Sequence, residues 1–289
     1  MLNLADNALQ LRQLATLHLS AASALVCQGQ NLWLLADDAL VLQRYNLRGD
    51  WRAEQTLLPG ELPVDAKQRK RLKPDFEALL LLPEGGLLAL GSGSTKRRCR
   101  GCLVDSGSVR VIDLSPLYQA LAERFQDLNI EGGVVYGGQL LLAQRGNGRG
   151  RESALVLLDL PQVLRDLQDG QLRAAALQRI VPLQLPELDG VPLSLTDLSV
   201  APSGALYFTA TAEATDSSYL DGACVGSVLG RLDAQLTIVA LSRLTPVVKI
   251  EGLAFQADGR PLLVADADDP TIASPLFTLD DFSEPVCRN

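Results

Sequence analysis

The sequence has 289 residues, of which 47% are hydrophobic and 21% charged, and 34 acidic against 26 basic residues give a net charge of −8. This apolar fraction excludes a disordered chain, and the apolar runs are too short to span a bilayer, so we expect no membrane partner. The acidic balance argues against a nucleic-acid partner.

Histidine and cysteine are scarce, with His18 as the single histidine and five cysteines. One histidine cannot build a multi-histidine metal centre, and a Ser-His-Asp triad would have to use His18. No secretory signal is visible and the cysteine number is odd, so we expect reduced thiols in a cytoplasmic protein. Cys99 and Cys102 form one CxxC in a polar loop, where a pair without a role is favoured over a redox or metal site.

Short apolar runs that end in Gly, Asp, Asn or Pro predict strands along the whole chain. Examples are residues 31–36, 39–45, 87–90, 139–143, 205–210 and 261–265. Only residues 116–125 and 161–167 are predicted to be helical, and each segment has a proline near its start. Many short strands and turns are typical of a closed all-β architecture.

A repeated pattern organises these strands: a polar residue opens an apolar strand, a glycine-containing turn follows, and a second apolar strand comes next. The five opening residues are Ser23, Glu77, Glu131, Thr196 and Glu251, with spacings of 54, 54, 65 and 55 residues. The second predicted helix accounts for the long interval. Repeats of this length indicate propeller blades.

We therefore predict a single domain over residues 1–289, an all-β, five-bladed β-propeller with two short helical insertions. An N-terminal strand near Leu9 to Leu19 would complete the final blade. The alternatives are a six-bladed propeller with one degenerate blade and a β fold of another kind.

The opening residues are expected to form a ring at one mouth of the central channel, because the first strand of a blade lines that channel. Three carboxylates there would repel one another, and a bound hard cation would relieve the repulsion. Oxygen ligands select Ca²⁺ or Mg²⁺, and a wide, hydrated channel favours Ca²⁺. The alternative is that the glutamates bond backbone N–H groups of neighbouring strands. The predicted metal ligands are Ser23, Glu77, Glu131, Thr196 and Glu251.

The loops that follow the second strands are expected to surround the same mouth, and they are strongly polar. Arginines beside a divalent cation suit phosphate or carboxylate groups, and residues 91–94 can add backbone N–H donors. The basic segment 67–73 is expected nearby. Taken singly, each basic loop is better explained as solvated surface, and it is their convergence on one face that favours a site. The predicted anion-binding residues are Ser92, Ser94, Lys96, Arg98, Arg100, Arg145 and Arg149.

Short motifs around the ring resemble those of the calcium-activated nucleotidases, the soluble apyrase family. The motifs are Ser23-Ala-Leu, Phe76-Glu77-Ala78, Ile130-Glu131-Gly132 and Ile250-Glu251-Gly252-Leu253. The resemblance implies a five-bladed propeller with a central Ca²⁺ held by Ser and Glu residues. Thr196 departs from the Ser of that pattern, and the secretory signal of those enzymes is missing. The segments KPDFEALLLLP and LALGSGS also resemble uncharacterised bacterial β-propeller proteins.

Two classes of function follow from this reading. The first is a Ca²⁺-dependent hydrolase of a phosphorylated or otherwise anionic small molecule, in which Asp38 or Asp266 acts as general base. The second is a non-catalytic propeller that binds a ligand or a protein and keeps the ion for its structure. A lactonase-like or esterase-like Ca²⁺ propeller is a third hypothesis, and the scarcity of histidine opposes its histidine-dependent forms.

Overall fold

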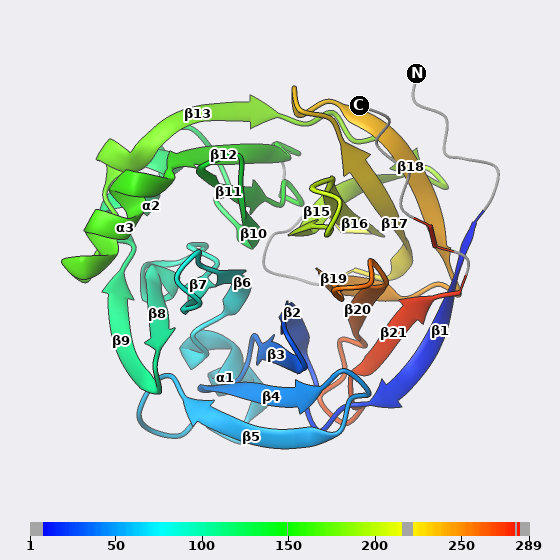
Figure 1. The fold of residues 1–289 in the computed structure, drawn as a ribbon, viewed down its shortest axis with the longest axis horizontal. Coiled ribbons are helices and arrows are strands. Elements are labelled where there is room, and N and C mark those ends of the chain that lie inside the picture. Colours follow the sequence, from blue (N-terminus) through cyan, green and yellow to red (C-terminus); the bar gives the residue numbers. More distant parts are fainter. Residues whose placement is uncertain (1–7, 149, 216–221, 281, 284–289) are drawn as a thin grey trace.

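The computed structural model describes residues 8–148, 150–215, 222–280 and 282–283, and the sheets they form are arranged around a central axis as a β-propeller (Figure 1). Three sheets have four strands each. They are β2 (Ala22–Gln28), β3 (Asn31–Ala36), β4 (Val41–Asn46) and β5 (Trp51–Thr56); β6 (Phe76–Leu81), β7 (Leu87–Gly91), β8 (Arg100–Asp105) and β9 (Ser108–Asp113); and β10 (Ile130–Tyr136), β11 (Gln139–Gln144), β12 (Ala154–Asp159) and β13 (Leu177–Pro182).

The remaining strands form a nine-stranded sheet in the order β14-β15-β16-β17-β18-β1-β21-β20-β19. Strand β1 pairs antiparallel with β21 over most of its length, whereas its parallel pairing with β18 involves only Leu9 and Gln10. The predicted N-terminal strand is therefore confirmed, and it lies beside the last strand of the chain. The strands are β14 (Glu187–Leu188), β15 (Val191–Val200), β16 (Leu206–Glu213), β17 (Cys224–Leu232), β18 (Ile238–Thr245), β1 (Leu9–Thr16), β21 (Pro275–Leu279), β20 (Pro261–Asp266) and β19 (Lys249–Phe255).

Five inner strands surround the axis. Strand β2 contacts β6, β6 contacts β10, β10 contacts β15, β15 contacts β19, and β19 returns to contact β2. These strands contain the five repeat positions that the sequence singled out. The repeat thus places one equivalent residue on each inner strand.

The apolar core lies in the wedges between neighbouring sheets. Leu90 of β7 and Leu142 of β11 belong to one buried cluster, and Leu35 of β3 and Leu79 of β6 belong to another. Strand β16 is covered on both faces, and every one of its residues is buried, including Thr209, Thr211 and Glu213. Because the wedges take up the apolar side chains, the axis is left for polar ones.

Helices α2 (Ser115–Ala122) and α3 (Leu160–Gln168) confirm the two predicted helical segments, and η1 (Lys96–Arg98) and η2 (Ala174–Ala176) are single 3-10 turns. Helix α1 (Ala66–Leu72) was not predicted. None of its residues is buried, so it lacks the apolar periodicity by which a sequence reveals a helix. Asp65 caps it by accepting a hydrogen bond from the Gln68 backbone N–H at 2.9 Å. Within the described residues, every helix falls short of the length and apolarity needed to cross a membrane.

Candidate functional site

Each of the five ring positions lies at a β-bulge of its inner strand. The ladder between the first and second strands shifts register across Ser23, Glu77, Glu131, Thr196 and Glu251. A bulge leaves its extra residue out of the ladder and re-aims that side chain. The five residues are therefore structurally equivalent, as the repeat predicted.

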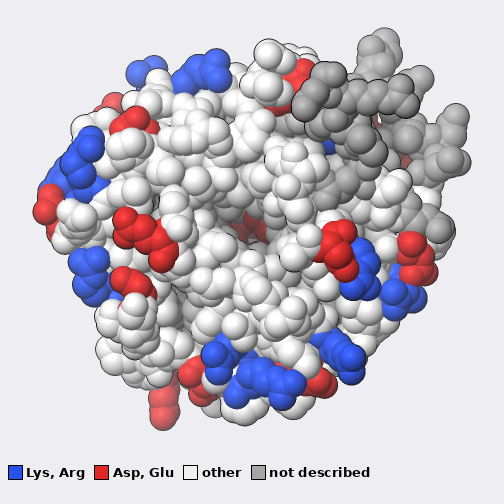
Figure 2. Space-filling view, in the orientation of Figure 1, with Lys and Arg blue, Asp and Glu red and all other residues white. Residues whose placement is uncertain are grey.

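Four of the five ring residues line one cavity of about 350 Å³ at the channel mouth: Ser23, Glu77, Glu131 and Glu251. Acidic side chains are visible in the central opening when the molecule is viewed down its axis (Figure 2). The polar loops converge here as expected, and they contribute Asp38, Arg98, Arg145 and Asp266, while the basic segment contributes Arg69, Lys70 and Lys73. Among the described lining residues, nine are Asp or Glu and six are Lys or Arg, so the cavity carries an excess of negative charge.

Other predicted site residues lie elsewhere. Thr196 is fully buried, donates to Thr209 Oγ1 at 2.9 Å and is not among the described residues that line the cavity. Ser92 is buried and donates to Asp75 Oδ2 at 2.6 Å, and Ser94 accepts from Arg98 Nη1 at 2.8 Å. Lys96 and Arg100 are not among the described residues that line the cavity. Lys96 is exposed, and Arg100 of β8 is half-buried. Arg149 lies outside the described residues.

Arg145 gathers the glutamates of the ring. Its Nη1 lies 2.8 Å from Glu131 Oε2, and its Nη2 pairs with Glu213 and lies 3.6 Å from Glu251 Oε1. The Arg145 side chain is only 7% exposed. The guanidinium therefore holds protein carboxylates, instead of facing the cavity free to receive an anion.

Lys249 supplies the second cation of this network. Its Nζ lies 3.1 Å from Glu251 Oε1, 3.2 Å from Glu213 Oε1 and 2.7 Å from Asp268 Oδ1. The pKa of Glu131 is raised to about 8 by burial, which is the larger cause, and by the carboxylates around Glu131. Arg145 opposes this shift. Much of the ring charge is thus neutralised by the protein's own cations.

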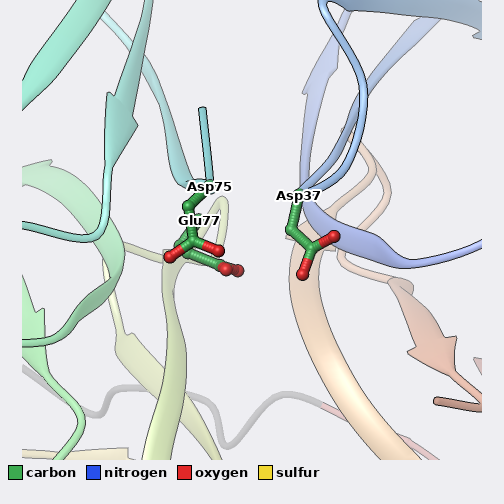
Figure 3. Close-up of side chains that lie close together, drawn as sticks. All are labelled: Asp37, Asp75 and Glu77. Atoms are coloured by element: carbon green, nitrogen blue, oxygen red, sulfur yellow. The ribbon is translucent and has the colours of Figure 1, made fainter. Parts of the chain in front are cut away.

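Glu77 stands apart from this network. Its carboxylate, that of Asp75 and that of Asp37 each offer an oxygen, and these three oxygens lie within 4.8 Å of one another. Asp75 and Glu77 extend side by side and face Asp37 across a gap (Figure 3). Among the residues that the structure describes, Glu77 has no hydrogen-bond or ion-pair partner.

The electrostatic environment of this cluster disfavours bare negative charge. Burial, with Glu131, Asp75 and Asp37 nearby, raises the pKa of Glu77 well above its usual range. Burial also raises the pKa of Asp37 to about 6, although Lys73 opposes the shift. A bound cation would favour the charged forms of Glu77 and Asp37, because an opposite charge nearby lowers the pKa of a carboxyl.

The two predicted general bases differ in their surroundings. Asp38 accepts from Arg69 Nη1 at 2.7 Å, so its charge is already paired. Asp266 ends β20 and accepts from the Asp268 backbone N–H at 3.0 Å. Burial is the main reason why the pKa of Asp266 rises to about 7, a value suited to taking or giving a proton at neutral pH.

A second ring of residues was missed by the sequence reading. It lies two positions before the first ring, in most repeats at the start of the inner strand or just before it. Asp75 precedes Glu77, Lys249 precedes Glu251, and Asn129 precedes Glu131 and donates to its Oε1 at 2.5 Å. Ala21 and Ser194 occupy the corresponding positions in the other two repeats. The period of two in motifs such as Asp75-Phe-Glu77 was the signal that could have revealed them.

The metal-free protein is expected to lose stability as pH rises from 5 to 8. The pKa values of Asp37, Asp266 and Glu131 are raised to about 6, 7 and 8, so the folded state holds protons that the unfolded chain releases near its ordinary values. This contribution to the free energy of unfolding is fully present below about pH 4, and it is lost as the pH rises through the three raised pKa values. Thermal melts in chelator should show a falling melting temperature across this window, and a smaller fall in Asp266→Asn. A melting temperature that rises with pH there would contradict the assignment.

Comparisons with solved structures show likeness in fold. The chain is similar to a glutaminyl cyclase from Myxococcus xanthus, with 13% identity, a TM-score of 0.54, and 95% of this chain and 100% of that one covered. It is similar to a gluconolactonase from Xanthomonas campestris at 11% identity and a TM-score of 0.45, covering 93% and 89% of the two chains. The WD40 β-propeller domain of Doa1 matches at 9% identity and a TM-score of 0.42, with 94% and 98% covered.

No curated protein matches the sequence. One family model does, and it matches residues 18–280, which include every inner strand and all of the described residues that line the cavity. The chain therefore belongs to this family, which is described as a family of unknown function, DUF6929.

Proposed function

We propose that the channel mouth binds Ca²⁺ between Asp37, Asp75 and Glu77 and hydrolyses an anionic small molecule there. A phosphate ester or anhydride is the substrate class that we propose first. The observation that carries the proposal is the Glu77 carboxylate, which lies beside Asp75, faces Asp37 and makes no hydrogen bond or ion pair with the described part of the chain. The ligand set differs from the ring expected from the sequence, because Glu131 and Glu251 are paired with Arg145 and Lys249.

We also propose that the fold is a five-bladed propeller. Its blades would be the three four-stranded sheets, the group β15 to β18, and the group β19, β20, β21 and β1. Support comes from the five inner strands, each of which contacts the next around the axis. It also comes from the short pairing of β1 with β18, which involves only two residues of β1. In this arrangement the N-terminal strand completes the last blade.

The donor set suits Ca²⁺ better than Mg²⁺. All three groups are carboxylates, and the cavity beside them leaves space for water ligands. Ca²⁺ accepts six to eight oxygens in flexible geometry, whereas Mg²⁺ demands a tight octahedron. When bound, the cation would polarise a phosphoryl oxygen and lower the pKa of a coordinated water.

The protein groups around the cation have separate roles in this proposal. Asp266 takes the proton of the attacking water, since burial brings its pKa to about 7. The substrate anion is held through the cation, because Arg98 and Arg145 are already paired with Asp75 and Glu131. The resemblance to the calcium-activated nucleotidases makes nucleotides the first substrates to test, followed by sugar phosphates and lactones.

One observation favours a non-catalytic alternative in which the ion only stabilises the fold. The three arginines among the described lining residues, Arg69, Arg98 and Arg145, each hold a protein carboxylate, so the charge that would assist a departing phosphate is engaged in structure. In that case Ca²⁺ would raise the melting temperature without any turnover.

Glu77→Gln is the variant that tests the proposal. Wild-type protein is expected to gain about 2.7 kcal/mol of stability when Ca²⁺ is at one hundred times its Kd, and Glu77→Gln is expected to lose this gain. Calorimetry and thermal melts with Ca²⁺ and with chelator measure both. Hydrolysis of the substrate panel should be abolished by chelator, and Asp266→Asn should lower kcat by about 10²–10⁴-fold while Ca²⁺ binding persists.

Glu84→Gln is the matched control, because Glu84 is exposed in the turn between β6 and β7. It should bind Ca²⁺ as the wild type does. Wild-type protein that shows no Ca²⁺-dependent heat or stabilisation would refute the metal site. Binding without turnover of any substrate in the panel would favour the non-catalytic alternative.

A further inference from the structure

We propose that Lys73 is a tethered counter-ion of the cation site, and that Ca²⁺ binding displaces it and releases the α1 segment from the channel mouth. This inference rests on the proposed function, because it describes how the same site is regulated. It is carried by the position of one ammonium group and by the way in which α1 is attached.

The Lys73 ammonium already occupies the place of a cation. It pairs with Asp37, and its Nζ lies 3.0 Å from Asp75 Oδ1. These are two of the three carboxylates that converge with Glu77. Only 12% of the Lys73 side chain is exposed, so the charge sits inside the site. A divalent cation coordinated by the same oxygens would meet a like charge at contact distance.

Helix α1 is held to the mouth by polar contacts. None of its residues is buried, so no apolar anchor fixes it. Arg69 Nη1 reaches Asp38 Oδ2 at 2.7 Å, and the Lys70 carbonyl accepts from Arg98 Nη2 at 3.1 Å. Lys73, directly after the helix, adds its pairs with Asp37 and Asp75. The mouth carboxylates therefore hold the segment that precedes β6.

Competition follows from this arrangement. In the absence of a cation, Lys73 neutralises the site and draws α1 onto the cavity, whose lining includes Ala66 and Arg69. When Ca²⁺ takes the oxygens of Asp37 and Asp75, Lys73 loses its partners. The segment then loses one of its attachments just as the site gains its metal, so metal loading and access to the cavity are coupled.

Calorimetric titration of Ca²⁺ into Lys73→Gln tests the competition. The variant is expected to bind Ca²⁺ at least about tenfold more tightly than the wild type, because a unit charge a few ångströms from the ion has been removed. Its melting temperature in chelator should fall and be restored by Ca²⁺. Lys67→Gln is the control, since Lys67 is an exposed residue of the same helix, and it should bind Ca²⁺ with wild-type affinity.

Limited trypsin digestion of the wild-type protein gives a second measurement that does not depend on the folding of a variant. Ca²⁺ is expected to speed cleavage after Lys67, Arg69, Lys70 or Arg71 several-fold, as followed by mass spectrometry. Unchanged or slower cleavage, or equal Ca²⁺ affinity in Lys73→Gln and wild type, would overturn the inference and leave the metal site standing. If neither protein binds Ca²⁺, the proposed function fails and this inference fails with it.

Discussion

Replacement of Arg145 by Met is expected to destabilise the protein by about 3–5 kcal/mol, the usual cost of removing one partner from a buried ion network. The side chain is 7% exposed and holds Glu131 at 2.8 Å, with Glu213 and Glu251 on its other nitrogen. Methionine keeps much of the volume but leaves these carboxylates without the guanidinium. Lys249 is then the cation that still pairs with Glu213 and Glu251. Urea unfolding at pH 7.5 measures the loss.

Two comparisons sharpen this test. Arg97→Met changes the same residue type at an exposed position and should alter stability by less than about 0.5 kcal/mol. Acidification should shrink the loss in Arg145→Met, because Glu131, whose pKa burial already raises, then takes up a proton. A loss below about 1 kcal/mol, as for an exposed ion pair, would show that the network contributes little.

Gly132→Ala is expected to cost about 3 kcal/mol or more, at or above the upper end of the usual range for overpacking. A Cβ on Gly132 would lie 2.6 Å from Asp197 Cα and 2.7 Å from its Oδ1. Backbone cannot rotate aside as a side chain can. Asp197 also accepts from the backbone N–H groups of Leu198 at 2.7 Å and Leu253 at 2.8 Å, so its displacement would disturb three inner strands.

The matched control for this change is Gly86→Ala. The atoms nearest to a Cβ there are at 3.4 Å or beyond, which is ordinary contact, and we expect an effect below about 1 kcal/mol. Urea unfolding of both variants gives the comparison. Equal stability of the two would mean that β10 and β15 can separate without cost.

The repeat predicted the ring because a bulge at one place in each inner strand is a local feature that recurs with the repeat. Ser23, Glu77, Glu131 and Glu251 came together at the cavity for this reason. Thr196 shares the bulge but is fully buried against Thr209, since its side chain meets the second strand of its own hairpin.

The pairing of charges could not be predicted in the same way. Arg145 was predicted from the sequence to lie among residues that face a substrate. In the structure its guanidinium pairs with Glu131 and Glu213, which belong to two different sheets. Which carboxylate a long side chain finds depends on sheet packing, and repeat spacing does not encode that. Helix α1 was missed for a related reason, because its contacts are with the mouth carboxylates and leave no apolar pattern in the sequence.

The pairing of β1 with β21 has a consequence for how the protein is made. Arg12 and Asp280, which pair across these strands, are 268 residues apart in the chain. At the usual pace of synthesis, β1 waits on the order of tens of seconds on the ribosome before β21 has been translated. The cavity draws Asp37 from the first sheet and Lys249 from the last inner strand. The channel mouth can therefore assemble only after nearly the whole chain has emerged, and until then the network around the ring glutamates lacks Lys249.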